Sequence, residues 1–240
     1  MSRRLPNAIV VIALYGFMST AAYAQLKDNL ELNFFGAGSW YTHKNYQVSF
    51  PQSTLPVNGE FHLDRAIRGG VRVGVYTRGH WSEEIFYSYE PNKLHLLRTT
   101  APPTSLNLPM QVHNYGVNAI YYFNDDENHA VRPFVSIGVG GTLFRLTPEA
   151  EAFVKDPLRG DIPEMHSSNE LSMNYGFGVK TRVNHWLGFR MDAKGFLIPT
   201  PSFGLPHTSS DPTAQVLPLT GATHNAEVSA GIIVYFFGKR

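Results

Sequence analysis

Two residues in the second half of the chain have the types and spacing of a nucleophile and its base. His166 and Ser168 are separated by one residue, and side chains at i and i+2 of a strand point the same way. A serine nucleophile needs a histidine to take its proton and a third group to orient that histidine. The stretch from Leu171 to Lys194 offers only Asp192 as an acid. We therefore predict that the chain has no catalytic site. His166 and Ser168 are the two candidates if this prediction is wrong.

A second set of residues carries charges of both signs at alternate positions of strand-like stretches. This alternation predicts that the charges share one face, which we expect to line the narrow interior of a barrel. Enclosed charges must pair or stay hydrated. We expect a salt-bridged interior, and a gated small pore or ion leak is the alternative that uses the same residues. The members of this expected lumen charge cluster are Arg68, Arg72, Glu84, Arg132, Lys180, Arg182, Arg190, Asp192, Lys194 and Glu227.

The ten histidines form no local metal motif. Metal ligands on one element typically have the spacing H-x-H or H-E-x-x-H, and no pair of histidines here has either spacing. We expect no metal site and no cofactor, and a metal could bind only where distant histidines converge. The chain also lacks a basic run or a basic patch with interleaved aromatics, so a nucleic-acid partner is not expected.

The composition indicates a sheet that faces lipid. Charged residues make up 16% of the 240 residues and aromatic residues 13%, whereas an ordinary soluble domain has about 25% charged residues. Hydrocarbon excludes charge, and membrane interfaces favour aromatic rings. The mean hydropathy of −0.18 is compatible with strands that turn one side to a polar interior. Because the chain has no cysteine, a continuous sheet or a membrane must hold it together instead of disulfides.

The first 24 residues have the pattern of a secretory signal. Arg3 and Arg4 form a basic start, residues 8–18 are apolar, and small residues lead to an Ala-x-Ala site that ends at Ala24. The apolar part is shorter than the roughly 20 residues of a membrane-spanning helix. We expect export by the Sec pathway, removal of residues 1–24, and one mature domain over residues 25–240.

Eight stretches of the mature chain alternate between apolar and polar or small residues, as strands do. The sixth is the clearest, because Leu171, Met173 and Tyr175 share one parity while Ser172 and Asn174 share the other. Most are about as long as a tilted transmembrane strand or slightly longer. The expected strands are 29–41, 65–76, 81–90, 111–123, 131–144, 169–182, 186–197 and 225–237.

The connections between these strands alternate strictly between long and short. The long ones are 42–64, 91–110, 145–168 and 198–224, and the short ones are 77–80, 124–130 and 183–185. An up-and-down membrane barrel has short turns at one end and long loops at the other, whereas a Greek-key sandwich has no reason to sort them. Residues 147–153, in the third long connection, are expected to form a short surface helix.

Aromatic residues cluster at both ends of the expected strands. Those near the short turns are Tyr76, Trp81, Tyr121, Tyr122, Phe123, Trp186, Tyr235 and Phe236. Those near the long connections are Trp40, Tyr41, Tyr87, Tyr89 and Phe144. Two such girdles are typical of a membrane barrel. We therefore predict an all-β, eight-stranded antiparallel up-and-down transmembrane β-barrel.

One long segment of the sequence resembles OmpA-like outer-membrane β-barrel proteins. Residues 174–194, NYGFGVKTRVNHWLGFRMDAK, look like their penultimate hairpin, and residues 199–204 are similar to a loop entry in some bacterial members. The resemblance implies residence in the outer membrane of a Gram-negative cell. We expect no peptidoglycan-binding domain after the barrel.

The last strand resembles the β-signal that the barrel-assembly machinery reads. Its polar, glycine, hydrophobic and aromatic positions are Ser229, Gly231, Val234 and Phe236, and the chain departs from the usual form by continuing to Arg240. The resemblance implies two partners, the barrel-assembly machinery during biogenesis and outer-membrane lipid afterwards.

Residues 166–169 resemble the His-x-Ser-Asn motif of lipid A deacylases, which are also eight-stranded barrels and use a His, Ser and Glu triad. The expected downstream Glu is missing from the run Leu171 to Lys194, where Asp192 is the one acid, and the motif lies where a loop meets a strand. We expect a non-enzymatic outer-membrane barrel with a structural role, or with surface binding through four long external loops. A narrow porin-like channel is the first alternative, and a lipid A deacylase-like esterase is the second. The sequence does not specify an external ligand.

Overall fold

The fold is seen in a computed structural model that describes most of the chain after residue 29. The described residues are 30–48, 57–98, 104–124, 130–155, 165–205, 217, 219 and 221–236. The expected signal segment, residues 1–24, lies outside them, and its removal after Ala24 stays a prediction. Among the described residues, no helix combines the length and the apolarity needed to cross a membrane.

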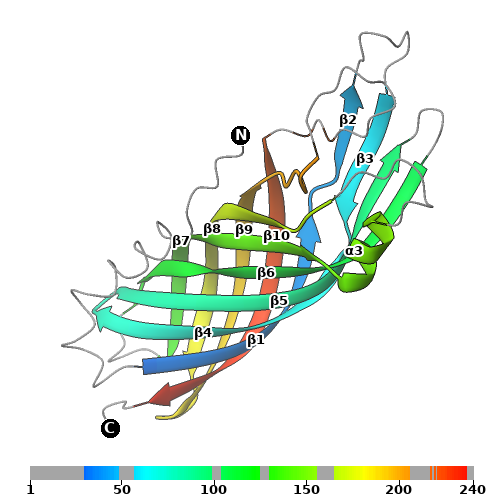
Figure 1. Cartoon of the computed structure of the whole chain (residues 1–240). Helices are drawn as coiled ribbons and strands as arrows, with labels where there is room; N and C mark the ends of the chain where they lie inside the picture. Colours follow the sequence, from blue (N-terminus) through cyan, green and yellow to red (C-terminus); the bar gives the residue numbers. More distant parts are fainter. Residues whose placement is uncertain are drawn as a thin grey trace.

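Eight antiparallel strands close into a barrel (Figure 1). Each strand pairs with its sequence neighbour in the barrel, and β1 closes the wall against β10 in a continuous register from Leu30–Phe236 to Tyr41–Asn225. The predicted fold class and all eight expected strands are therefore confirmed. The barrel strands are β1 (Leu30–Tyr41), β4 (Ala66–Arg78), β5 (Trp81–Arg98), β6 (Thr104–Tyr122), β7 (Val131–Leu146), β8 (Ser168–Arg182), β9 (Leu187–Pro199) and β10 (Ala222–Phe236).

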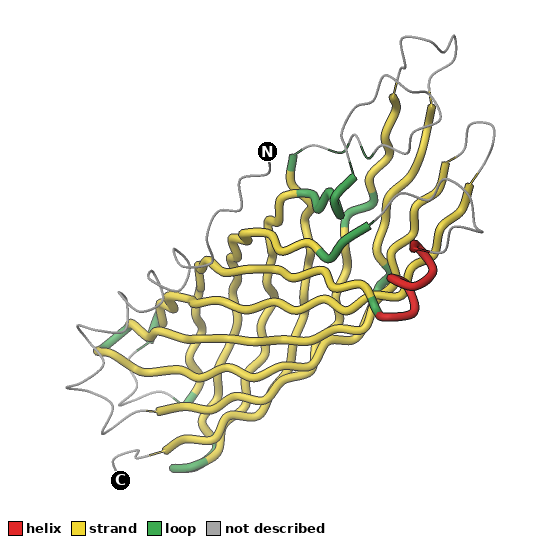
Figure 2. Tube along the Cα trace, viewed as in Figure 1, coloured by secondary structure: helices red, strands yellow, loops and turns green. Residues whose placement is uncertain are grey.

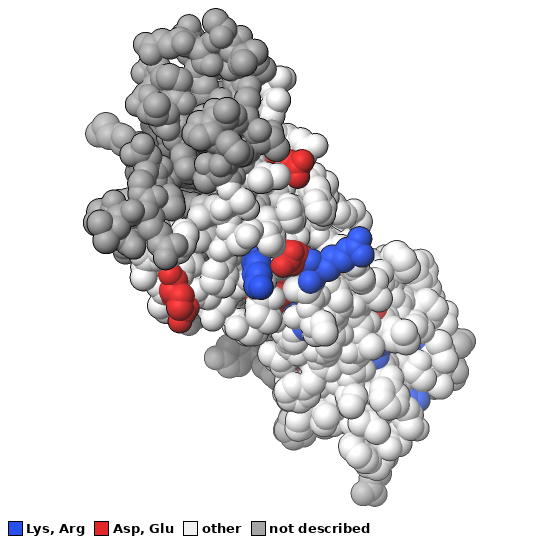
Figure 3. Space-filling view, turned by 90° about the vertical axis from the view of Figure 1, so that its right-hand side faces the viewer, with Lys and Arg blue, Asp and Glu red and all other residues white. Residues whose placement is uncertain are grey.

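The alternation of side chains places apolar residues on the outside of the barrel. On β8, Leu171, Met173 and Phe177 are exposed, whereas Ser172 and Asn174 are buried. This is the reverse of a soluble sheet and is what contact with lipid requires. On the face shown in Figure 3, most of the described surface is uncharged, and the visible charged side chains gather mainly across its middle and upper part.

Much of the first two long connections forms strands rather than loops. Residues 42–64 contain β2 (Lys44–Val48) and β3 (Val57–Leu63), and β5 and β6 continue through most of residues 91–110. β3 pairs with the outer part of β5, so these four strands extend the sheet beyond the barrel (Figure 2). We call this part, β2 and β3 with residues 91–98 and 104–112, the external extension.

The third long connection contains the expected short helix, α3 (Pro148–Lys155). Thr147 precedes it, and its hydroxyl accepts a hydrogen bond from the Ala150 backbone N–H at 3.3 Å, as an N-cap does. The helix is not merely a surface element, because Ala150 and Val154 are buried against the interior of the extension.

The two aromatic girdles are present, but some of the aromatic residues expected in them point into the barrel. Trp81, Phe123, Trp186 and Phe236 are exposed near the short turns, and Trp40, Tyr87 and Tyr89 are exposed near the other rim. The expectation is wrong for Tyr41, Tyr122 and Phe144, which point into the barrel and are buried. It is also wrong for Tyr235, whose ring lies beneath Arg182 inside the end of the barrel. Neighbours in a strand face opposite sides, so Tyr121 and Tyr122 cannot both face lipid. The side chain of Tyr76 lies outside the described part of the structure.

Candidate functional site

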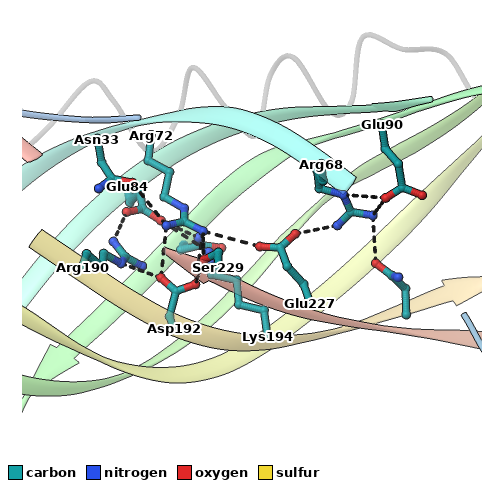
Figure 4. Close-up of polar contacts among 12 residues, drawn as sticks. Asn33, Arg68, Arg72, Glu84, Glu90, Arg190, Asp192, Lys194, Glu227 and Ser229 are labelled. Atoms are coloured by element: carbon teal, nitrogen blue, oxygen red, sulfur yellow. Dashed lines mark hydrogen bonds and ion pairs between the residues drawn. The ribbon is translucent and has the colours of Figure 1, made fainter. Parts of the chain in front are cut away.

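The barrel interior contains a buried ionic network with two centres (Figure 4). The first centre is Arg68 on β4, whose side chain is fully buried. Its guanidinium lies 2.8 Å from Glu90 of β5 and 2.6 Å from Glu227 of β10. It also donates to the Tyr41 hydroxyl and to Asn225 Oδ1, each at 3.0 Å. Arg68 thereby links four consecutive strands of the wall, β5, β4, β1 and β10.

The second centre lies nearer the short turns and is built from β4, β5 and β9. Arg72 lies 3.1 Å from Asp192. Arg190 donates to the same carboxylate at 2.6 Å and also pairs with Glu84. Lys194 lies 3.6 Å from Glu84. Every one of these side chains is buried, so each charge is compensated by ion pairs rather than by bulk water.

Glu227 joins the two centres. One of its carboxylate oxygens faces Arg68, and the other lies 3.5 Å from Arg72. Together the centres contain the cations Arg68, Arg72, Arg190 and Lys194 and the anions Glu84, Glu90, Asp192 and Glu227. The formal charges cancel. Because a buried charge without a partner is costly, this balance favours a static plug over a lumen with a fixed charge for selecting ions.

Cationic side chains near the short turns lie over aromatic rings. Lys180 pairs with Glu31 of β1, and Arg132 stacks over the Tyr122 ring at 4.0 Å from its centroid. Arg182 stacks over Tyr235 at 4.5 Å. Cation–π contacts of this kind are stabilising when the partners are partly desolvated. They close the network at the end of the barrel opposite the extension.

The interior above the ionic network is apolar. Inward side chains of β5 and β6 change from Glu90 and Asn114 to Leu94, Leu108 and Met110, all buried. Other members come from β3, from α3, from the outer ends of β7 and β9, and from the segment after β9. We call this group the apolar cap, and its buried members include Phe61, Leu63, Leu94, Leu106, Leu108, Met110, Phe144, Leu146, Val154, Phe196, Ile198, Phe203 and Leu219.

A tight turn places Phe203 at the centre of the cap. Phe203 has φ 52° and is followed by Gly204 with φ 85°, a conformation that costs a non-glycine residue free energy. The Leu205 backbone N–H donates to Ser202 O at 2.9 Å across this turn. The ring is fully buried and meets Phe144 edge-on at 6.1 Å between centroids, so burial offsets the backbone strain.

The structure brings nearly all of the expected charge cluster together. Arg68, Arg72, Glu84, Arg132, Lys180, Arg190, Asp192, Lys194 and Glu227 are buried inside the barrel, and Arg182 is half-buried at its end. Sequence reasoning missed Glu90, Glu31, Asn225 and Tyr41. Glu90 has the same parity as Glu84, so extending the alternation by three pairs of residues would have found it. Glu31 has the parity of Asn33 and Asn225 that of Glu227, so the same alternation would have indicated both.

The residues of the expected assembly signal occupy β10. The Ser229 hydroxyl donates to Asp192 at 2.6 Å, and Phe236 pairs with Leu30 at the end of the closing seam. Gly231 lies where a side chain would collide, since an added Cβ would stand 2.5 Å from Phe34 O and 2.8 Å from Phe35 Cβ. Gly231 therefore has a packing role in the finished barrel. Its recognition during assembly stays a prediction.

The serine and histidine of the deacylase-like motif do not form the contact that a hydrolase needs. The Ser168 hydroxyl donates to Glu170 at 2.6 Å, so its proton is directed at a neighbouring carboxylate. His166 is exposed, and its backbone N–H donates to Phe203 O at 2.8 Å. A nucleophilic serine must donate to a base that is itself oriented by a third group, and these contacts give no support to such an arrangement.

A group of metal-ligand side chains lies on the outside of the extension. His62 of β3, Asp64 and His95 of β5 each place one ligand atom within 4.8 Å of the others. Burial, followed by the proximity of His95 and His43, lowers the pKa of His62, so its imidazole is neutral at neutral pH. His95 lies more than 30 residues after His62 and Asp64 in the sequence, so local spacing could not reveal this convergence.

Comparisons with known proteins support the fold. No family model matches the chain, and no curated protein sequence matches it. It is similar to the crystal structure of Neisserial surface protein A, NspA, with a TM-score of 0.51 and 12% identity over 86% of this chain and 97% of that one. It is also similar to OprG from Pseudomonas aeruginosa, with a TM-score of 0.54 and 14% identity over 87% and 96%. The chain thus has the fold of the eight-stranded outer-membrane β-barrel proteins.

Proposed function

We propose that this protein is a non-conducting outer-membrane barrel that presents a rigid binding surface outside the cell. One observation carries the proposal: the external extension continues the barrel sheet through the paired strands β3, β5 and β6 and is not a set of separate loops. Binding residues are commonly carried by segments that a rigid scaffold positions, and here the scaffold itself reaches past the rim. Insertion by the barrel-assembly machinery after export belongs to the same proposal.

The filled interior favours a closed lumen over the porin-like alternative. An ion that entered from outside would meet the apolar cap first and the neutral ionic network next. An eight-stranded barrel is also narrow enough for side chains to fill. Both layers consist of buried side chains, which supports a closed lumen.

Planar-bilayer recording and site-directed labelling test this proposal. The purified barrel should give no conductance steps, and reproducible steps whose size changes in Arg72→Ala would overturn the closed lumen. The chain has no cysteine, so single cysteines can report orientation. Asn58→Cys on β3 should react with a large impermeant maleimide in intact cells, whereas Val183→Cys at a short turn should react only after permeabilisation. The opposite pattern would overturn the external placement of the extension.

The esterase alternative has its own test. Ser168→Ala should leave the acylation of lipid A unchanged in cells that express the protein, because the Ser168 hydroxyl is bound to Glu170. Acyl release that depends on Ser168 would overturn the non-enzymatic assignment.

A further inference from the structure

Strand pairing sets two imidazoles side by side on the outer face of the extension. His62 of β3 and His95 of β5 are direct partners in the antiparallel register, and their rings stack with centroids 4.5 Å apart. Asp64 follows His62 by two residues, immediately after β3 ends at Leu63. Its carboxylate Oδ1 lies 3.0 Å from His95 Nε2. Three potential ligands thus converge from two adjacent strands.

A neighbouring strand orients the His95 ring. Asn107 of β6 is the register partner of His95, and its Oδ1 lies 2.6 Å from His95 Nδ1. A hydrogen bond donated by Nδ1 to this carbonyl leaves a lone pair on Nε2, the atom that faces Asp64. Metal-ligating histidines characteristically donate their second ring N–H in this way, which fixes the tautomer and the ring orientation.

The main chain at Asp64 is held in place as well. The Asp64 backbone N–H donates to Asn92 Oδ1, and Asn92 Nδ2 donates to Asp64 O, each at 3.0 Å. Asn92 Nδ2 also donates to Glu90 of the ionic network. The carboxylate is therefore presented from a backbone that is anchored to the barrel interior, so little freedom would be lost when it binds a ligand.

Two buried ring nitrogens of this group lack a hydrogen bond. His62 Nδ1 and His95 Nε2 are inaccessible to water and have no hydrogen-bond partner among the described residues. His95 Nε2 is close to Asp64, yet the contact lacks hydrogen-bond geometry. Ligand atoms around an ion at about 2.1 Å stand about 3.0–3.4 Å apart, so the His95–Asp64 spacing suits a shared cation. Unsatisfied buried polar atoms otherwise cost free energy.

We propose that His62, Asp64 and His95 bind a divalent transition-metal ion, with Zn²⁺ as the reference, on the external face of the protein. Two imidazoles and one carboxylate are a usual ligand set for zinc, and three protein ligands leave a coordination position for water or an external donor group. His43 stacks on His62 at 4.8 Å between centroids and helps to hold that ring in place. The proposal does not depend on the proposed binding function.

Calorimetric titration of the full-length barrel in detergent, free of any histidine tag, tests this site with Zn²⁺ alone. We expect one ion per chain. His62→Ala, Asp64→Asn and His95→Ala should each weaken binding at least tenfold, and His95→Ala should weaken it most. Asn107→Ala should weaken binding about tenfold through the orientation of His95. His185→Ala, which removes an exposed histidine at the opposite end of the barrel, is the matched control and should bind like the wild type.

Each variant is first checked for a heat-modifiable band on gel electrophoresis, so that a loss of binding is not a loss of folding. Co²⁺ provides a second readout, because an intense visible absorption band reports four- or five-coordinate binding. Wild-type protein that binds no Zn²⁺ would overturn the proposal. The proposal would also be overturned if the His62→Ala/His95→Ala double variant bound Zn²⁺ with the stoichiometry and affinity of the wild type.

Discussion

The lower and upper halves of the barrel interior have opposite chemistry although the same strands build both. Inward positions of β6 are Asn114 and Asn118 in the lower half but Leu108 and Met110 in the upper half. The outward positions change in the opposite sense, from Tyr115 and Val117 to Asn107, Pro109 and Gln111. One strand thus inverts its apolar face as it passes the rim.

The solvent outside the wall determines the chemistry of the side chains inside it. At membrane level the outer face meets hydrocarbon, so apolar residues face outward and polar residues are left to fill the lumen. Beyond the rim the outer face meets water, and the sheet follows the soluble rule with an apolar interior. The apolar cap is therefore the core of a small soluble-type unit set on top of the membrane barrel.

The largest expected loss of stability comes from removing a cation from the ionic network in the lower half of the barrel. Arg68→Ala leaves Glu90 and Glu227 buried without their main partner, and such a loss costs about 3–5 kcal/mol. Urea titration in lipid vesicles, followed by the fluorescence of the three tryptophans, measures the free energy of unfolding. Arg145→Ala, at an exposed position, is the control. A loss below about 1 kcal/mol for Arg68→Ala would mean that the network is not stabilising.

Removing apolar volume tests the upper half. Leu108→Ala should lower the free energy of unfolding by about 3 kcal/mol, since the side chain is almost fully buried in the apolar cap and a cavity adds to the lost transfer free energy. Ser105→Ala, at an exposed position on the same strand, should change it by less than about 0.5 kcal/mol. Equal values for the two variants would show that the cap is not a packed core.

A charge on the outer wall distinguishes the two levels directly. Ile137→Arg places a cation where the side chain is 61% exposed on the membrane-level wall, and this should cost about 2–3 kcal/mol in vesicles. Ser105→Arg, on the external extension, should cost almost nothing. The same urea titration applies. If both substitutions were neutral, the outer face at Ile137 would not be in contact with lipid.

The smallest expected effect concerns a single hydrogen bond in the network. Ser39 donates to Glu90 at 2.5 Å, and both side chains are buried. Ser39→Ala should therefore cost about 1.5 kcal/mol, the lower end of the range for a hydrogen bond to a charged group. Ser229→Ala offers a comparison, because Ser229 donates to Asp192 at 2.6 Å. An unchanged midpoint for both variants would indicate that the carboxylates are satisfied by other donors.

The sequence was sufficient to predict the barrel, because the apolar parity is constant over the membrane-level part of each strand. It was insufficient for the external extension. Leu106, Leu108, Met110 and Val112 alternate as clearly as any strand, but with the parity opposite to that of the lipid-facing residues, and the prolines nearby favoured a loop interpretation. The alternation of residues 106–112 indicates a strand only if its outer face is assumed to contact water and its apolar side chains to face inward.

Pairings across the barrel were beyond sequence reasoning. Parity predicted that Arg68, Arg72 and Asp192 face inward, but it does not say which of them meet, because a register shift of two residues preserves the parity. The convergence of His62 with His95 depends on the same register. Side-chain orientation was therefore predictable from the pattern, and partner identity was not.

The uninterrupted pairing of β5 with β6 has a mechanical consequence. Their register runs from Trp81–Tyr121 to Arg98–Thr104 without a break, and strands of this length measure about 60 Å, roughly twice the hydrocarbon thickness of a membrane. The paired strands β5 and β6 form one stiff unit, and the half of this unit nearer the short turns is part of the barrel wall. A pulling force on its tip is carried as shear along the whole hydrogen-bonded ladder, so a load on the outer surface would be transmitted to the membrane rather than absorbed by a flexible hinge.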